Sequence, residues 1–521
     1  MLPEPGLAMR GGCSTSPCGP RRVPVGFHMT RETARPRTRL RAPGGPREEL
    51  LRRGELRYQS PMQAPDPWGE RLPRKLGLAS TVAVLVGSTI GSGIFRTPAE
   101  IAGHIDDLTL FVLAWVAGGA VALAGALTVA ELAILYPRSG GIYVYLREAF
   151  GKLPAFLFGW AELLILRPAA YGAIAVTSAE YLLRTLKVDG AAPLLGPLSR
   201  AQVVAVAMIA TVAAVNRRGV EFGAIVQNIS TALKVAALLG LVALGLLLAP
   251  EPATAAPAVA PPAADGAFVL AMVAILWAYD GWCDVGFVSG EVRDPQRALP
   301  RVFILGTAAV VALYLAANFV YLRVIPLEQM AGAPLVAADV AAALIGPIGT
   351  TLVAAAVMIS TFGTLNGSMM TGPRVFYAMA EDRLFFRRLA QVHPRHGTPS
   401  ASIVLGAALG IVFVSVRSFA ELAGQFVIGI WPFYALSVAA VFVLRRRRPE
   451  LPRPYRTLGY PWVPLLFLAA SVFLLGNYAW SQPREFVVDC AVVLSGVPVY
   501  WLWSRRAPTA EDRGENPAAR A

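Results

Sequence analysis

Two apolar stretches of the sequence contain residues that could bind a charged small molecule through the peptide backbone. The first, Gly87–Phe95, has the sequence GSTIGSGIF and holds three glycines and two serines. Each glycine lowers the stability of a helix by about 1 kcal/mol relative to alanine. The spacing of Gly87 and Gly91 is equally typical of close packing between membrane helices. This stretch alone therefore does not decide between a helix break and a helix contact.

The second stretch, Trp277–Trp282, favours the break. It places Asp280 directly before Gly281 in the middle of another apolar segment, and further glycines follow. A carboxylate at this depth is costly and normally faces a cavity or a partner. Interrupted hydrophobic segments at corresponding places in two halves of a chain indicate a transporter built from inverted repeats. We therefore predict that the helices through 76–102 and 266–289 both unwind near their middles.

An unwound membrane helix exposes peptide groups of both polarities. The N–H groups that begin its second half carry partial positive charge and bind anions. Residues 92–94 would offer such N–H groups to a carboxylate, and the carbonyls of Thr89, Ile90 and Trp277 would accept from an ammonium group. A zwitterionic α-amino acid carries both charges and is the expected ligand. The predicted binding residues are Thr89, Ile90, Ser92, Gly93, Ile94, Trp277, Ala278, Asp280 and Gly281.

The composition indicates which elements must position these residues. The chain has 521 residues, of which 55% are hydrophobic and 15% charged, whereas soluble proteins carry about 25% charged residues. Long apolar runs without the alternation of membrane strands indicate helices, because hydrocarbon leaves backbone groups no outside partner. We predict an all-α membrane protein with twelve transmembrane helices. The expected spans are 76–102, 108–135, 153–183, 200–216, 222–249, 266–289, 299–323, 347–379, 401–417, 421–444, 461–481 and 486–504.

The charges of the loops predict the orientation. Arginines concentrate in alternate loops, and positive residues are retained in the cytoplasm, so both termini are expected there, in the cell (inner) membrane. The N-terminal region is rich in Arg, Pro and Gly and is expected to be disordered. The expected boundaries are 1–70 for a basic cytoplasmic tail, 71–505 for a transporter domain, 76–249 and 266–444 for its inverted repeats, 461–504 for two appended helices, and 506–521 for a second cytoplasmic tail.

Several other classes of protein are disfavoured. The net charge of +14 lies in the tails and short loops rather than on a folded basic face, so we expect no nucleic acid partner. Cys13, Cys18, Cys283 and Cys490 are too scattered for a disulfide framework. The histidines lack metal-ligand spacing, and no phosphate-binding Walker motif is present. We therefore expect no metal, no cofactor and no enzymatic activity.

Six stretches together resemble the amino acid–polyamine–organocation superfamily, and more closely its L-type amino acid transporter branch. The resemblance covers about residues 76–504, and it is specific because the stretches occur jointly. They are Gly87–Phe95, Glu131–Gly151, Trp160–Pro168, Trp277–Trp282, Glu291–Pro300 and Gly363–Tyr377. The resemblance implies the LeuT-like 5+5 inverted repeat, with the first and sixth helices broken. It also implies amino acid substrates, exchanged or moved without sodium.

The resemblance implies roles for individual residues as well. It places the carboxylate site on Ser92 and Gly93, and the amine site on Thr89 and the carbonyl of Trp277. Trp277 would also act as a gate that covers the substrate. Lys234 would reach the broken first span, where related sodium-coupled carriers place a sodium ion. The alternative for Lys234 is snorkelling to the membrane interface, which its mid-span position disfavours.

Two features depart from the pattern of the eukaryotic members. Asp280 stands where many of them have glycine, and it could contact the substrate amine, accept a proton or pair with a structural cation. The loop 184–200 lacks the cysteine that joins eukaryotic light chains to a heavy chain. We therefore expect no disulfide-linked heavy chain, and a monomer or weak homo-oligomer. Trp431 and Tyr434 are expected to be packing or interface residues rather than ligand contacts.

The remaining polar residues within the spans suggest structural or gating roles. Glu162 and Arg167 lie five residues apart, off a common helix face, so a direct pair between them is not expected. Glu131 and Arg374 have opposite charges at similar depth and are predicted to pair as an inner gate. Asn366 is expected to form a helix–helix hydrogen bond near the site rather than to polarise the pocket.

These observations favour a secondary active transporter that moves neutral L-amino acids by alternating access, with the substrate and the lipid bilayer as its partners. Sodium-independent exchange and proton-coupled uptake both remain open. A polyamine or amine carrier of the same fold is an alternative, disfavoured because Asp280 is the one evident acid of the pocket. A sensor that binds an amino acid without moving it is a further alternative, but neither tail resembles an output domain.

Overall fold

The computed structural model describes residues 72–248, 267–333, 335–416 and 419–506, which are predominantly helical. The predicted N-terminal tail and residues 507–521 lie outside this range. Within the described residues, nine helical segments are long and apolar enough to cross a membrane, which makes the chain a multi-pass helical membrane protein. They are Leu78–Ala102, Leu108–Leu135, Lys152–Thr185, Val220–Leu248, Pro295–Val324, Pro347–Glu381, Phe426–Arg447, Trp462–Ser481 and Pro483–Arg505.

The first half of the described chain folds into helices with one short hairpin. Asp107 caps α4 by accepting a hydrogen bond from the Leu110 N–H at 2.6 Å, and Ser199 begins α8 in a reciprocal capping box with Gln202. The elements are α2 (Leu78–Thr89), α3 (Gly93–Ala102), α4 (Leu108–Leu135), α5 (Ile142–Phe150), α6 (Lys152–Ala161), the π-helical turn η1 (Glu162–Leu166), α7 (Arg167–Thr185), the antiparallel strands β1 (Pro193–Leu195) and β2 (Leu198–Ser199), α8 (Arg200–Arg217) and α9 (Val220–Leu248).

The second half is also helical. Several of its helices begin at prolines, whose missing N–H group is unpaired at a helix start in any case. The elements are α10 (Ala267–Tyr279), α11 (Asp284–Phe287), η2 (Ser289–Glu291), α12 (Pro295–Arg301), the π-helical turn η3 (Val302–Gly306), α13 (Thr307–Val324), α14 (Leu327–Ala331), α15 (Val336–Ile345), α16 (Pro347–Thr371), α17 (Pro373–Glu381), η4 (Arg387–Ala390), α18 (Ser400–Val416), α19 (Phe419–Arg447), α20 (Trp462–Ser481), α21 (Pro483–Leu494) and α22 (Gly496–Arg506).

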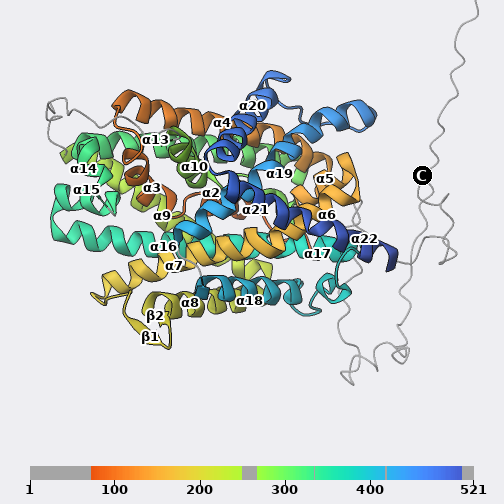
Figure 1. The fold of residues 1–521 in the computed structure, drawn as a ribbon, viewed down its shortest axis with the longest axis horizontal. Helices are drawn as coiled ribbons and strands as arrows, with labels where there is room; N and C mark the ends of the chain where they lie inside the picture. Colours follow the sequence, from red (N-terminus) through yellow and green to blue (C-terminus); the bar gives the residue numbers. More distant parts are fainter. Residues whose placement is uncertain (1–71, 249–266, 334, 417–418, 507–521) are drawn as a thin grey trace, which may run out of the picture. The chain divides into compact units, whose positions relative to one another are not determined.

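A group of long helices supports the interrupted ones. Helices α7 and α16 lie side by side, and α8 and α18 pack against α7 (Figure 1). Helix α2 packs on α9 and α16, whereas α3 packs on α10. The two interrupted segments, α2–α3 and α10–α11, therefore contact each other and rest on α16.

The last helices show the surface expected of a protein in lipid. Large apolar side chains of α20 and α21, including Trp462, Val472, Trp480 and Val487, are exposed. Large contiguous apolar surface is rare on soluble proteins. On these helices it fits contact with lipid tails.

The predicted pair between Glu131 and Arg374 is wrong. The Glu131 carboxylate accepts hydrogen bonds from Arg445 Nε and Nη2, at 2.9 and 2.6 Å, and from the N–H group and hydroxyl of Thr457, each at 2.8 Å. Arg374 instead donates to Glu291, at 2.8 and 3.1 Å. Similar depth in the membrane does not determine which helices are lateral neighbours, and that neighbourhood selects the partner.

The four hydrogen bonds to Glu131 predict a large effect on stability. The variant Glu131→Gln should lower the free energy of unfolding by about 3 kcal/mol, because Arg445 then keeps a partly buried charge without its counter-ion. Thermal unfolding of the purified protein in detergent measures the change. The matched control is Glu221→Gln, which removes an exposed contact to Lys75 at 3.4 Å and should leave the midpoint nearly unchanged. Equal midpoints for both variants would contradict this account of Glu131.

Candidate functional site

The two interruptions lie against each other. Helix α2 ends at Thr89 and α3 begins at Gly93, while α10 ends at Tyr279 and α11 begins at Asp284. A Cβ atom added at Gly93 would lie 2.5 Å from the Cα atom of Ala278, closer than a side chain allows. The glycine-rich stretch Gly87–Phe95 therefore contains both a helix break and a close contact between helices, the two possibilities that its sequence left open.

Gly281 allows the second break to reach the first. Its φ angle is +106°, a conformation that favours glycine. A Cβ atom at this position would lie 2.7 Å from the backbone nitrogen of Thr89 and 2.8 Å from the carbonyl carbon of Ser88. The backbone of the second break therefore runs directly over the end of α2.

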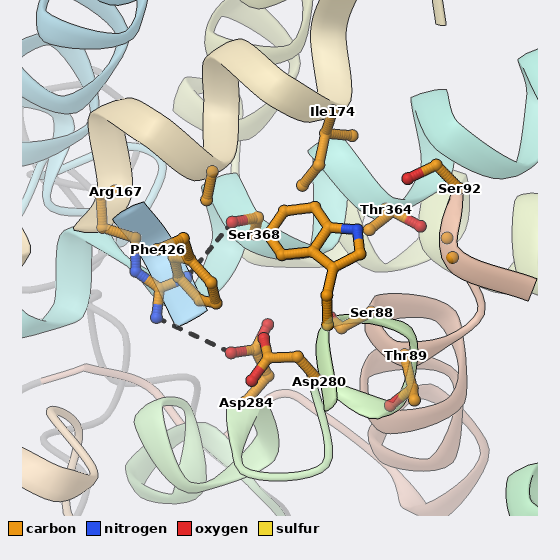
Figure 2. Close-up of a pocket in the computed structure, with 15 residues that line it drawn as sticks. Ser88, Thr89, Ser92, Arg167, Ile174, Asp280, Asp284, Thr364, Ser368 and Phe426 are labelled. Atoms are coloured by element: carbon orange, nitrogen blue, oxygen red, sulfur yellow. Dashed lines mark hydrogen bonds and ion pairs between the residues drawn. The ribbon is translucent and has the colours of Figure 1, made fainter. Parts of the chain in front are cut away.

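A small pocket, with a cavity volume of about 40 Å³, lies between the two breaks and the helices α7, α16 and α19 (Figure 2). Six of the nine predicted binding residues line it, whereas Ile90, Ile94 and Ala278 lie beside the breaks without lining it. Figure 2 shows serine and threonine side chains of both α2 and α16 near the pocket, with the two aspartates below Ser368 and Thr364. The lining residues are Ser88, Thr89, Gly91, Ser92, Gly93, Arg167, Ala170, Ile174, Trp277, Asp280, Gly281, Asp284, Thr364, Ser368 and Phe426.

The start of α3 supplies one binding element of this pocket. Ser92 and Gly93 line the pocket at the N-terminus of this ten-residue helix. The first N–H groups of a helix have no partner within the helix, and they carry partial positive charge. This end of the pocket therefore suits an anion such as a carboxylate.

Two carbonyls predicted to bind an ammonium group already have donors from the protein. The carbonyl oxygen of Ile90 accepts from Lys234 Nζ at 2.7 Å and from the Ser360 hydroxyl at 3.0 Å. The carbonyl of Thr89 accepts from the Tyr314 hydroxyl at 2.9 Å. The prediction for these carbonyls is therefore wrong, because a freed carbonyl in an apolar bundle takes the nearest protein donor. An ammonium group must find other acceptors.

Lys234 fills the first break, as the family resemblance implies. Its side chain is fully buried, and Nζ donates to the carbonyls of Gly87 and Ile90, both at 2.7 Å, and to the Thr364 hydroxyl at 3.0 Å. These three acceptors match the three N–H donors of an ammonium group. Lys234 does not snorkel; it neutralises the partial negative charge at the end of α2.

Asp280 supplies an acceptor in the second break. Its Oδ1 atom accepts a hydrogen bond from the Tyr434 hydroxyl at 2.7 Å, and its carboxylate lines the pocket. Tyr434 and Trp431 do not line the pocket, but Tyr434 does more than pack because it bonds a residue that does. Trp431 stacks on Phe467, with centroids 5.2 Å apart. The bond from Tyr434 fixes the orientation of the Asp280 carboxylate.

Trp277 closes one side of the pocket with a second aromatic residue. Its ring meets Phe426 edge to face, with centroids 5.5 Å apart. Ile174 of α7 adds an apolar contact surface on the pocket wall. Together these side chains make an apolar cover over a polar floor.

Arg167 connects the floor of the pocket to the supporting helices. It donates to Glu162, lies 3.7 Å from an oxygen of Asp284, and donates to the Ser368 hydroxyl at 3.2 Å. The expectation that Glu162 and Arg167 do not pair is wrong. The turn η1 between them is π-helical, and the Arg167 N–H bonds to the carbonyl of Glu162, which brings residues five apart onto one face.

Sequence reasoning missed several residues of the site. Asp284 went unnoticed although it lies four residues after Asp280 in the same apolar segment, and that second acid was a usable signal. Ser368 and Phe426 had no comparable signal. Asn366 does not line the pocket; it bonds Asn216 and Gln227 at 2.9 Å and joins α16 to α8 and α9, as expected.

Comparison with known proteins identifies the family. The profile of the amino acid permease family matches residues 76–500. The chain belongs to this family. It is 31% identical to the serine/threonine exchanger SteT of Bacillus subtilis, over 84% of this chain and 98% of that protein. It is also 31% identical to the human b(0,+)-type amino acid transporter 1, over 85% of this chain and 90% of that protein, and to the large neutral amino acids transporter small subunit 2 of Oryctolagus cuniculus, over 83% and 81%.

The contacts of Lys234 predict that this side chain stabilises the permease. The variant Lys234→Met removes the charged donor that the carbonyls of Gly87 and Ile90 share. Hydroxyl groups of Thr364 and Ser360 still donate to these carbonyls, so the expected cost is that of a lost charge-assisted hydrogen bond, about 1.5–3 kcal/mol. We expect a lower thermal unfolding midpoint and loss of substrate binding, measured by fluorescence-detected unfolding and by a radioligand assay. Lys75→Met is the control, because Lys75 lies at the surface. Wild-type binding in Lys234→Met would show that this side chain does not maintain the site.

Proposed function

We propose that this permease moves amino acids across the cell membrane by alternating access, with the pocket between the two breaks as its substrate site. The observation that carries the proposal is the pairing of an α3 N-terminus with an acid-lined break inside an apolar bundle. One end of the pocket favours a carboxylate and the other an ammonium group. The relatives, a serine/threonine exchanger and transporters of neutral amino acids among them, support the same substrate class.

Each part of the substrate has a proposed partner. The N–H groups at Ser92 and Gly93 bind the carboxylate, as free helix N-termini bind anions. The carboxylate of Asp280 and the carbonyl of Trp277 bind the ammonium group. The Trp277 carbonyl accepts a hydrogen bond from the Asp280 N–H at 3.2 Å, whereas the carbonyls of Thr89 and Ile90 each accept two or more. The Trp277 ring covers the bound substrate as the gate. The substrate side chain lies toward Phe426, on the apolar wall.

We also propose the finer architecture that the sequence predicts. The chain crosses the membrane twelve times, as two inverted repeats of five helices with two appended helices, and both termini are cytoplasmic. In the described residues, nine long apolar segments, the shorter apolar helices Ala267–Tyr279 and Ser400–Val416, and helix α8 (Arg200–Arg217) correspond to the twelve predicted spans. The chain works without a disulfide-linked heavy chain, since the loop 184–200 has no cysteine.

A cationic substrate is the second candidate, favoured by one observation. Three acids, Asp280, Asp284 and Glu162, lie in or beneath the pocket, whereas Arg167 is the one cation among the described residues that line it. Asp280 alone among these acids was assigned to the pocket from the sequence. This surplus of negative charge makes a cationic amino acid or an amine a competitor to the neutral substrate.

Counterflow in proteoliposomes distinguishes these possibilities. Vesicles loaded with unlabelled neutral amino acids should accumulate labelled serine, threonine or leucine transiently, without sodium, and faster than vesicles loaded with putrescine. The same panel with and without a pH gradient separates exchange from proton-coupled uptake. Binding without accumulation would show that the protein is a sensor, and preference for putrescine or lysine would show that the cationic alternative is correct.

The role of Asp280 predicts a specific loss. The variant Asp280→Asn removes a charged acceptor for the ammonium group and should weaken substrate binding by about tenfold to a hundredfold, the usual value of a charge-assisted hydrogen bond. Competition binding measures the affinity for the amino acid. The control is Asp382→Asn, which removes an acid bonded to Arg147 outside the pocket. Unchanged affinity in Asp280→Asn would remove this residue from the proposed amine site.

A further inference from the structure

The segment before α2 is tied to the chain that follows the second break. Residues 72–77, here named the strap, form a parallel bridge to Val292 through Leu76. The Leu76 N–H donates to the carbonyl of Glu291 at 2.9 Å, and the Arg293 N–H donates to the carbonyl of Leu76 at 2.8 Å. Because the strap continues directly into α2, it joins the inner halves of the two interrupted helices.

Arg74 extends this connection. Its guanidinium group donates to the carbonyl of Val292 at 3.1 Å and to the carbonyl of Pro137 at 3.3 Å. Pro137 lies in the loop after α4, which the distribution of arginines predicts to be cytoplasmic. The strap therefore holds three segments together at the predicted inner end of the permease.

The side chain of Glu291 makes a separate connection to a supporting helix. Its carboxylate accepts from Arg374 Nε and Nη2, at 2.8 and 3.1 Å, with the side chains 0% and 1% exposed. Arg374 belongs to α17, which continues α16 after Gly372. Glu291 is thus bonded to the strap through its backbone and to α17 through its side chain.

An ion pair as deeply buried as Glu291–Arg374 is expected to be either fully formed or fully separated. Separating two buried charges leaves each without compensation unless water reaches them, so the pair does not loosen gradually. Opening a water-filled path at the inner end would hydrate both charged groups and lower the free energy needed to separate them. The pair therefore stabilises the closed inner end specifically.

The opposite end of the permease has a much weaker contact. Arg96 of α3 lies 3.5 Å from Glu180 of α7, with side chains 35% and 46% exposed. Solvated pairs of this kind contribute little. The inner end therefore contains a buried ion pair between Glu291 and Arg374, whereas the Arg96–Glu180 pair at the other end is solvated.

We propose that the Glu291–Arg374 pair is the latch of the inner gate, and that the strap makes α2 and residues 284–291 move together when the latch opens. This inference rests on the proposed transport function. It assigns to Glu291 the gating partnership with Arg374 that the sequence had assigned to Glu131. Glu291 and Arg374 are gating residues and do not contact the substrate pocket.

Accessibility of the pocket from the inner side tests the latch. Ser88 lines the pocket, so Ser88→Cys in a variant without the four native cysteines provides a single thiol there. A membrane-impermeant methanethiosulfonate reagent is applied to the predicted cytoplasmic face in inside-out vesicles. Glu291→Gln should raise the labelling rate about tenfold, because the inner-open population grows when the closed state loses its pair.

Two further variants test whether the labelling rate depends on the Glu291–Arg374 pair itself. Arg374→Lys retains the charge but loses the bidentate geometry, and it should raise the rate by a smaller factor. The double charge reversal Glu291→Arg with Arg374→Glu should return the rate toward that of the parent. The matched control is Asp382→Asn, which breaks a bonded arginine pair at the same end between α5 and the residue after α17 and should leave the rate unchanged.

The outcomes separate the latch from the transport function. Counterflow by the parent protein with equal labelling rates in the parent, Glu291→Gln and Arg374→Lys would overturn the latch while transport stands. An increase of the same size in Asp382→Asn would also overturn it, since the effect would then follow from any lost ion pair at that end. Absence of counterflow by the parent would overturn the transport function on which the latch rests.

Discussion

Unwinding two helices inside an apolar bundle frees peptide groups that must be satisfied without water, and the rest of the structure follows from how this is achieved. At the first break the carbonyls are satisfied by the protein itself. Lys234 donates to the carbonyls of Gly87 and Ile90, Ser360 also donates to that of Ile90, and Tyr314 donates to that of Thr89. Ser92 and Gly93, at the start of α3, line the pocket. At the first break, the carbonyls at the end of α2 therefore have protein donors, and the start of α3 remains available for a ligand.

The second break has the complementary arrangement. Its acids, Asp280 and Asp284, face the same pocket, and each is held by a residue of a supporting helix. Tyr434 of α19 holds Asp280, and Arg167 of α7 lies beside Asp284. In the proposed binding mode, a zwitterion between the breaks meets positive charge from α3 and negative charge from the second break. The contacts of Tyr434 and Arg167 also connect the proposed substrate site to α19 and α7, helices that would change position during transport.

The sequence predicted the parts of this arrangement that depend on composition along one helix. The break at Gly91 and Gly93, the break after Asp280 and the burial of Lys234 follow from glycines and single charges within apolar runs. The position of a break is a local property, so a single segment is sufficient to predict it.

The errors concern properties that a single segment does not contain. The partners of Glu131 and Arg374 depend on which helices are neighbours, and the bond between Tyr434 and Asp280 joins residues 154 positions apart. The pair of Glu162 and Arg167 depends on a π-helical turn, which the ordinary helical periodicity does not predict. The occupied carbonyls of Thr89 and Ile90 were mistaken for ligand sites because their donors come from other helices.

A structure determined by electron cryo-microscopy with a saturating neutral amino acid tests the central claim most directly. The account predicts density for one amino acid between the breaks, with its carboxylate within hydrogen-bond distance of the N–H groups at Ser92 and Gly93. Its ammonium group should face Trp277 and Asp280. Density elsewhere in the protein, or an amino acid in this pocket with its two charges reversed, would contradict the account.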